Sequence, residues 1–354
     1  MDRPALSALN RGVQNLDSII RQQSRSEKGV VCLRGGWARR LAGVILALVL
    51  CTAMAGAVNM ERKLVPVGHT VGVKLFARGV MVVRPPEDGT PAQTCGLEAG
   101  DVIVRCGGTA VTSTEQFQSL LQQGGDTELE VNRNGGDVKL SVEPERNAAG
   151  EYQIGAWIRD SMAGIGTMTW YDPEDGTFGA LGHGITDVDT ALLMPFSQGS
   201  ILFSTVKAVK RGEAGSAGEL RGDFDLTGSL GTLYANTDRG VFGRLDDGAV
   251  STLEMSEALP LGTPEDGRGV ILANVRRGDV AAYAVEVETA RDGQDMLLHV
   301  TDPALLEATG GIVQGMSGSP VLQNGKLVGA VTHVLLRDPS RGYGISIEKM
   351  LEAA

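Results

Sequence analysis

The most apolar segment of the chain is the run LAGVILALVLCTAMAGAV, residues 41–58, which contains no charged residue. As an α-helix rising about 1.5 Å per residue, it would span about 27 Å, close to a bilayer core of about 30 Å. Arginines lie just before it, and a basic flank marks the cytoplasmic side of a membrane helix. We therefore predict a transmembrane signal-anchor at 41–58 and a cytoplasmic segment at 1–40, with everything after about residue 60 outside the cytoplasm.

The small residues Ala53, Ala55 and Ala57 near the end of this run also permit cleavage by signal peptidase. The uncleaved anchor is favoured, because nearly forty residues precede the run. A tether, NMERKLVPVGHT at 59–70, follows it. Its charged start and its Pro and Gly predict an extended, accessible segment.

Residues 71–143 predict a compact unit of two strands, one helix and a closing hairpin. A capping box that starts at Thr112 or Ser113 opens the helix, and Phe117 lies on its apolar face. The hairpin turn is Asn-Gly-Gly at 134–136, whose residues tolerate positive φ. The polar stretch at 144–151 is predicted to be a linker between domains.

Within this unit the segment GLEAGDVIVRCGGTAV, residues 96–111, resembles a PDZ domain of the protease-associated kind. The resemblance implies that one strand edge accepts a peptide as an added strand, either a partner's peptide or the chain's own tether. The residues of that edge would be Val71, Gly72, Val73, Lys74 and Leu75. The alternative is that they form an ordinary hydrophobic β-strand.

Residues 152–354 repeat short β patterns, most of them separated by Gly, Asp or Pro turns, which indicates a barrel or a sandwich. The whole chain has only 4% aromatic residues but 49 glycines, which favours a mainly β protein. Its formal charge of -11 argues against a nucleic-acid partner. The four histidines are scattered, without the spacing of a metal site, so we expect neither a metal nor another cofactor.

The segment GMSGSP, residues 315–320, has the composition of a nucleophile loop. Flanking glycines let the backbone turn tightly, expose the hydroxyl of Ser317 and direct amide N–H groups at a developing oxyanion. By resemblance to the GDSGGP segment of trypsin-like peptidases, the donors of this oxyanion hole would be the amides of Gly315 and Ser317, with Ser319 a bystander. The alternative is a Gly/Ser surface turn before a strand.

A serine nucleophile needs a base, and His183 in GALGHGI is the best candidate because glycines keep bulk away from its ring. His333 is the rival, although its β pattern favours a structural or substrate-lining role. The orienting carboxylate could be Asp302, Asp187 or Asp189. Asp302 follows a strand and precedes Pro, so it could equally cap a helix.

The stretches 154–186 and 299–351 closely resemble stage IV sporulation protein B, the SpoIVB-type serine peptidases of endospore-forming bacteria. This resemblance implies a trypsin-like double β-barrel and selects His183, Asp302 and Ser317 as the catalytic triad. The fold class expected for the chain is therefore mainly β: an N-terminal transmembrane helix, a PDZ domain at 71–143 and a serine peptidase domain at 152–354.

The resemblance also implies a role in sporulation signalling. Members of this family act in the space between the two forespore membranes, release themselves by self-cleavage, and cut a regulator that holds an intramembrane protease inactive. This cut leads to activation of the late mother-cell sigma factor. The alternative function is a non-catalytic PDZ-containing scaffold outside the cytoplasm.

Overall fold

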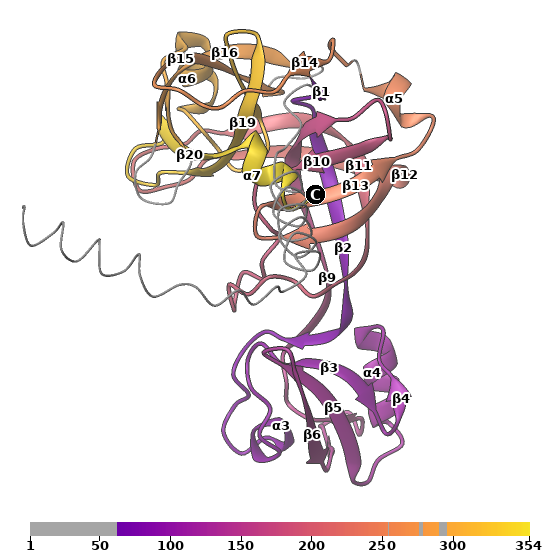
Figure 1. Cartoon of the computed structure of the whole chain (residues 1–354). Helices are drawn as coiled ribbons and strands as arrows, with labels where there is room; N and C mark the ends of the chain where they lie inside the picture. Colours follow the sequence, from indigo (N-terminus) through magenta and orange to yellow (C-terminus); the bar gives the residue numbers. More distant parts are fainter. Residues whose placement is uncertain (1–61, 254, 276–278, 290–295) are drawn as a thin grey trace, which may run out of the picture. The chain divides into compact units, whose positions relative to one another are not determined.

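The computed structural model describes residues 62–253, 255–275, 279–289 and 296–354. The predicted cytoplasmic segment, the signal-anchor at 41–58 and the start of the tether lie outside these ranges. In the described ranges no helix is long and apolar enough to cross a membrane. The described residues all belong to one compact unit, Val58–Ala354, whose elements are labelled in Figure 1.

The PDZ domain is a small sheet covered by two helices (Figure 1). Its core contains Ile103, Phe117 and Leu129, all buried. The elements are the end of β2 (Thr70–Val82), then α3 (Pro91–Thr94), β3 (Val102–Cys106), β4 (Thr109–Ala110), α4 (Thr114–Leu121), β5 (Thr127–Arg133) and β6 (Gly136–Val142).

The two local signals in this domain are confirmed. Helix α4 begins where Ser113 Oγ accepts from the Gln116 N–H at 3.1 Å, while Gln116 Oε1 accepts from the Thr112 N–H at 2.8 Å. The turn between β5 and β6 places Asn134 and Gly135 at φ 52° and 83°, the left-handed values such a hairpin requires.

The first barrel contains six strands closed by the pairing of β9 with β2. Its core contains Val73, Met168, Phe178 and Val241, all buried. Around the ring the strands are β9 (Ile158–Tyr171), β10 (Thr177–Ala180), β13 (Gly240–Leu245), β12 (Glu219–Thr237), β11 (Phe196–Lys210) and β2. Short elements beside it are β7 (Glu145–Arg146), β8 (Tyr152–Gln153), α5 (Ala249–Thr252) and β14 (Leu259–Pro260).

The second barrel is also closed and six-stranded, and its core contains Ile271, Val285, Met296 and Val331. Around the ring the strands are β15 (Gly267–Ala273), β16 (Ala281–Thr289), β17 (Met296–Val300), β20 (Arg341–Ser346), β19 (Lys326–Val334) and β18 (Pro320–Gln323). Helix α6 (Pro303–Thr309) follows β17, and α7 (Ile347–Leu351) ends the chain. A mainly β fold with a PDZ domain and a double barrel is thus confirmed.

The predicted peptide-binding edge is corrected by the pairing of β2. Residues Val71, Gly72, Val73, Lys74 and Leu75 pair with β9 on one side and with β11 on the other. Both edges of this stretch are therefore occupied by the chain itself, and no peptide strand can be added there. The ordinary-strand alternative holds for these five residues.

Strand β2 runs without a break from the first barrel into the PDZ domain. Its register against β9 shifts between Phe76 and Met81, where Gly79 lies at φ 99°. A Cβ on Gly79 would collide with the carbonyl of Ile103, so only glycine fits this irregularity. One strand consequently serves two domains, and the boundary lies inside it rather than at residue 71.

Two predicted connectors are also strands. The tether at 59–70 becomes β1 (Lys63–Pro66), which pairs with both β9 and β14 and buries Leu64. The linker at 144–151 contains β7 and the turn of a short hairpin, in which β7 pairs with β8. From Lys63 onward the tether is therefore neither extended in solvent nor accessible.

Candidate active site

The nucleophile loop lies between α6 and β18 and is fixed by hydrogen bonds to both barrels. The Thr167 N–H of β9 donates to the Ser317 carbonyl at 2.9 Å, and the Gly318 N–H donates to the Val331 carbonyl of β19 at 2.8 Å. Gly318 has φ 97°, and a Cβ there would collide with the Thr167 carbonyl. The loop can approach the first barrel this closely only with glycine after the serine.

The predicted oxyanion donors remain available. The carbonyl of Gly315 is turned away to accept from Thr167 Oγ1 at 2.8 Å, and Gly315 itself lies at φ 98°. Among the described residues, neither the Gly315 N–H nor the Ser317 N–H has a hydrogen-bond acceptor. Unpaired backbone N–H groups beside a serine hydroxyl are what an oxyanion hole requires. Their catalytic role stays a prediction.

The histidine loop follows β10. It is anchored by β9, the strand that also holds the nucleophile loop, because the Leu181 N–H donates to the Thr167 carbonyl at 3.1 Å. Leu181 and Gly182 both have positive φ, 70° and 67°, which turns the chain sharply into His183. A non-glycine residue held in this region indicates local strain, and such strain concentrates at functional sites.

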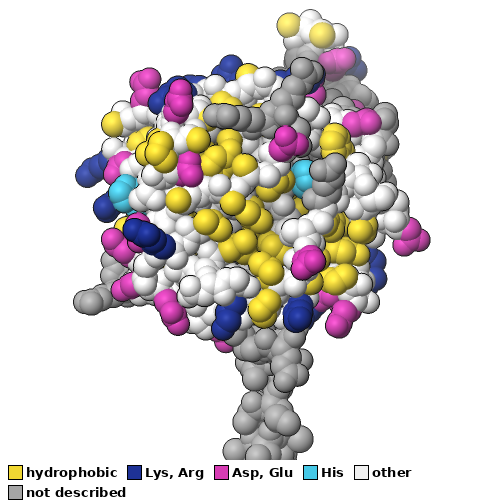
Figure 2. Space-filling model, turned by 90° about the horizontal axis from the view of Figure 1, so that it is seen from above, with side chains coloured by type: hydrophobic (Ala, Val, Ile, Leu, Met, Phe, Trp, Pro, Cys, Tyr) yellow, Lys and Arg dark blue, Asp and Glu magenta, His cyan; other side chains and the backbone are white. Residues whose placement is uncertain are grey.

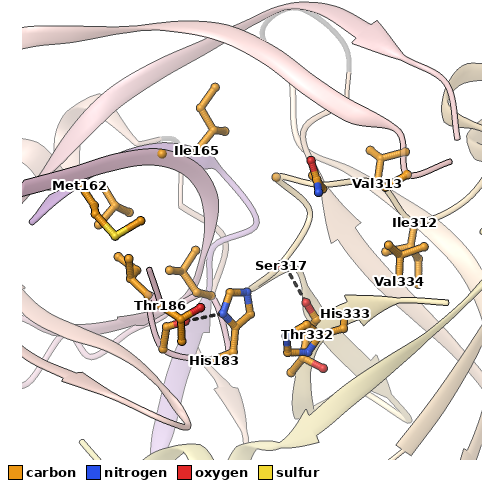
Figure 3. Close-up of a pocket in the computed structure, with 18 of the residues that line it drawn as sticks. Met162, Ile165, His183, Thr186, Ile312, Val313, Ser317, Thr332, His333 and Val334 are labelled. Carbon is orange, nitrogen blue, oxygen red and sulfur yellow. Dashed lines mark hydrogen bonds between the residues drawn. The ribbon is translucent and has the colours of Figure 1, made fainter. Parts of the chain in front are cut away.

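The structure brings His183 and Ser317 together in one cleft, where Figure 3 shows their side chains next to each other. His183 Nδ1 lies 2.8 Å from the Gly184 carbonyl. When Nδ1 carries the proton it donates to that carbonyl, which leaves Nε2 as the lone-pair acceptor that a general base needs. The Ser317 hydroxyl at present donates to the Thr332 carbonyl at 2.6 Å, so it must rotate to reach the imidazole.

A second histidine lines the same cleft. The ring of His333 lies 4.7 Å from that of His183, centroid to centroid, with a 33° angle between the planes. Burial lowers the pKa of His183; the Gly184 carbonyl opposes this and the neighbouring His333 adds to it. Burial also lowers the pKa of His333. Both rings therefore favour the neutral form.

Asp302 is not brought to His183 in this structure. Its Oδ1 accepts from the N–H groups of Ala304 and Leu305, at 2.9 and 3.2 Å, and caps α6. Its Oδ2 accepts from the Ala284 N–H at 3.3 Å. Asp302 is not among the residues that line the cleft. Its role as the triad carboxylate stays a prediction, and the contacts seen are those of a helix cap.

The two rival carboxylates are also engaged elsewhere. Asp187 is fully buried, forms an ion pair with Arg159, and accepts from the N–H groups of Asp189 and Thr190. Burial raises the pKa of Asp187, but the hydrogen bonds from Thr190 and Asp189 and the charge of Arg159 bring it below its usual value. Asp189 pairs with Arg159 and Arg84. In the described ranges, therefore, no carboxylate is hydrogen-bonded to His183.

Sequence reasoning missed Thr167 and Thr332, which hold the nucleophile loop and the serine hydroxyl. Neither lies in a recognisable motif, since each acts mainly through its backbone, so the only available signal was proximity in the fold. The described part of the chain contains no cluster of His, Cys, Asp and Glu able to hold a metal ion. Serine, imidazole and free backbone N–H groups together can perform acyl transfer.

The double barrel, the PDZ domain and this cleft define a PDZ-containing serine peptidase. Residues 150–351, more than half of the chain, match the family model described as SpoIVB peptidase S55, and residues 82–133 match a PDZ domain. The chain belongs to the SpoIVB peptidase S55 family.

Curated relatives match over shorter stretches. The chain is 32% identical over 67 residues to serine protease HTRA1 of Xenopus laevis, covering 19% of this chain and 14% of the relative. It is 54% identical over 43 residues to serine protease Do-like HtrA of Lactococcus lactis, covering 12% and 11%. The chain thus covers well under two thirds of the curated relatives it matches.

Two solved structures are similar at low identity. The PDZ domain of an SdrC-like protein from Listeria monocytogenes is 22% identical, covers 23% of this chain and 87% of its own, and gives a TM-score of 0.21. The Rv3671c protease in its inactive form is 13% identical, covers 53% and 82%, and gives a TM-score of 0.28.

The lowered pKa of His183 predicts a pH profile. The base is neutral above its own pKa, so the acid limb of kcat/KM should have its midpoint below 6.5, the value for an unperturbed histidine. The burial of His183 should leave the folding stability unchanged above about pH 6.5 and lower it below that pH, because the unfolded chain then binds more protons at this residue than the native one. Kinetics and thermal unfolding from pH 4.5 to 8 measure both, and an acid limb at or above 6.5 would contradict the burial of the base.

The two roles of Asp302 predict different results for Asp302→Asn. Asparagine is as good a helix cap as aspartate, so a capping role leaves kcat within about tenfold. In a triad the same change holds the imidazole in the wrong tautomer and costs about 10⁴ in kcat. From the contacts seen we expect the smaller effect, with Asp302→Ala lowering the melting temperature. A loss near 10⁴ for Asp302→Asn at unchanged stability would instead establish the triad carboxylate.

Proposed function

We propose that this serine peptidase is a membrane-anchored endopeptidase of sporulation signalling. It would release itself by self-cleavage and cut a regulatory membrane protein in an intramembrane-protease complex, outside the cytoplasm, leading to activation of the late mother-cell sigma factor. The observation that carries the proposal is the match to the SpoIVB peptidases over residues 150–351, together with His183 and Ser317 meeting in one cleft.

In the proposed reaction His183 Nε2 takes the proton of Ser317 as Oγ attacks the substrate carbonyl carbon. The N–H groups of Gly315 and Ser317 would stabilise the oxyanion, and His183 would then return the proton to the leaving amine. The Gly184 carbonyl, 2.8 Å from Nδ1, would keep the imidazole in the required tautomer by accepting the Nδ1 proton. Asp302, the third residue implied by the family, would orient the imidazole only after its carboxylate leaves the N-terminus of α6, which it caps in this structure.

We also propose that the PDZ domain binds a peptide, at a place other than Val71–Leu75. A cleft of about 340 Å³ lies between α4 and residues 151–158. The side-chain amide of Gln122 occupies part of it, accepting from the Tyr152 N–H at 2.9 Å and donating to the Tyr152 carbonyl at 2.8 Å. An amide that satisfies both backbone groups of one residue imitates a neighbouring strand, which a bound peptide could replace.

A serine-reactive fluorophosphonate probe tests the catalytic assignment. We expect labelling of the exported protein and at least a 10⁴-fold loss of labelling rate in Ser317→Ala and His183→Ala, because the members of a catalytic unit fail together. Ser319→Ala is the matched control, since Ser319 is buried and its hydroxyl has no hydrogen-bond partner. Labelling that survives Ser317→Ala in a folded protein would refute the nucleophile.

Self-release predicts where a cut can fall. From Lys63 the tether forms β1, which pairs with β9 of the first barrel and with β14, so an accessible bond must lie before it. Expressed with a functional export pathway, the full chain should yield a soluble fragment that begins between the apolar run and Lys63, while Ser317→Ala stays whole and membrane-bound. N-terminal sequencing of both forms is the measurement, and the same fragment from Ser317→Ala would mean that another protease makes the cut.

A further inference from the structure

The cleft that contains Ser317 has a volume of about 450 Å³ and is lined mainly by aliphatic side chains. Figure 3 shows Met162 and Ile165 on one side of Ser317, and Ile312, Val313 and Val334 on the other. None of the residues lining the cleft is Asp, Glu, Lys or Arg. Figure 2 shows that hydrophobic side chains also gather near the centre of one face of the molecule, with most of the charged ones around them.

The two apolar walls come from different barrels. Met162 and Ile165 belong to β9, while Ile312 and Val313 precede the nucleophile and Val334 ends β19. Substrate side chains on either side of the scissile bond therefore meet aliphatic surface. A charged side chain placed there would lose water without gaining a partner, which disfavours its binding strongly.

Strand β9 also presents a free edge to this cleft. Residues 161–166 pair with β2 on one side, and no other described strand pairs with them on the opposite side. The Met168 N–H donates to His69, on the β2 side, whereas the N–H and C=O of Thr167 bond to Ser317 and Leu181 on the other side.

Backbone groups alternate between the two edges of a strand with a period of two residues. Counting back from Thr167, the N–H and C=O groups of Ile165 and Ala163 point the same way as its own, toward the cleft. Both residues line the cleft, and Ala163 is exposed. This edge has the donors and acceptors that an extended chain needs for pairing.

We propose that the cleft binds its substrate as an added strand on β9, paired with Ala163 and Ile165, and selects aliphatic, uncharged residues on both sides of the scissile bond. The substrate class is thus an extended, apolar stretch of polypeptide. This inference rests on the peptidase activity of the family and adds to it a class of substrate and a mode of substrate binding.

Peptide substrates test the selection by side chain. Wild-type enzyme should cleave a peptide with Leu or Val around the scissile bond at least 100-fold faster, in kcat/KM, than matched peptides with Asp or Lys there. Val334→Asp, at a half-buried position, should raise the relative kcat/KM of the Lys peptide at least tenfold. Val188→Asp is the control, because Val188 is 81% exposed and lies outside the cleft lining. Equal cleavage of charged and aliphatic peptides by the wild-type enzyme would overturn the selection.

Strand addition is tested with the unaltered enzyme, by methylating one backbone nitrogen at a time along the best peptide. Loss of cleavage should alternate with a period of two residues, since only every second N–H faces β9. A uniform effect, or none, would overturn the pairing. If the fluorophosphonate probe still requires Ser317 in that case, the peptidase assignment stands and only this inference fails; if it does not, the assignment itself fails.

Discussion

The active site depends on one buried residue, Thr167 of β9, which is only 1% exposed. Its N–H donates to the Ser317 carbonyl, its hydroxyl donates to the Gly315 carbonyl, and its carbonyl accepts from the Leu181 N–H. A single residue of the first barrel thus fixes both the nucleophile loop and the turn that leads to His183. Each such bond contributes about 1 kcal/mol net, but a buried group left unsatisfied costs about 1–3 kcal/mol, so these contacts hold the two segments in register.

The local signals of the sequence predicted local structure well. Capping at Thr112 and Ser113, the Asn-Gly turn at 134–136 and the glycines around Ser317 each act over a few residues, and each appears as predicted. The pairing of strands could not be predicted from the sequence, because a strand has the same period-two pattern of side chains whether its backbone edge is free or paired with another strand. For Val71–Leu75 the pattern is therefore compatible with a free edge, whereas in the structure β9 and β11 pair with both edges.

The ambiguity of Asp302 has the same physical origin. An aspartate between a strand and a proline fits a helix N-cap and a strand-end catalytic carboxylate equally well, because both place the side chain at the end of an element. Only the fold decides which partners it meets, and here these are the N–H groups of Ala304, Leu305 and Ala284. The family pattern predicts a role for Asp302, but it does not predict which hydrogen bonds its carboxylate forms.

The apolar cleft also shapes the chemistry of the base. Burial lowers the pKa of His183, and the hydrogen bond and ring contact of its imidazole are with the Gly184 carbonyl and a second histidine, while no described carboxylate is hydrogen-bonded to it. The carbonyl can fix the tautomer, yet it carries no full negative charge, so an imidazolium formed in this arrangement, without Asp302, would be less stabilised than in a complete triad. Such a site depends more on substrate binding to exclude water and to align the scissile bond. In the proposed mode of binding, the aliphatic walls and the free strand edge of the cleft would supply this binding energy, which would link the choice of substrate to the rate of the reaction.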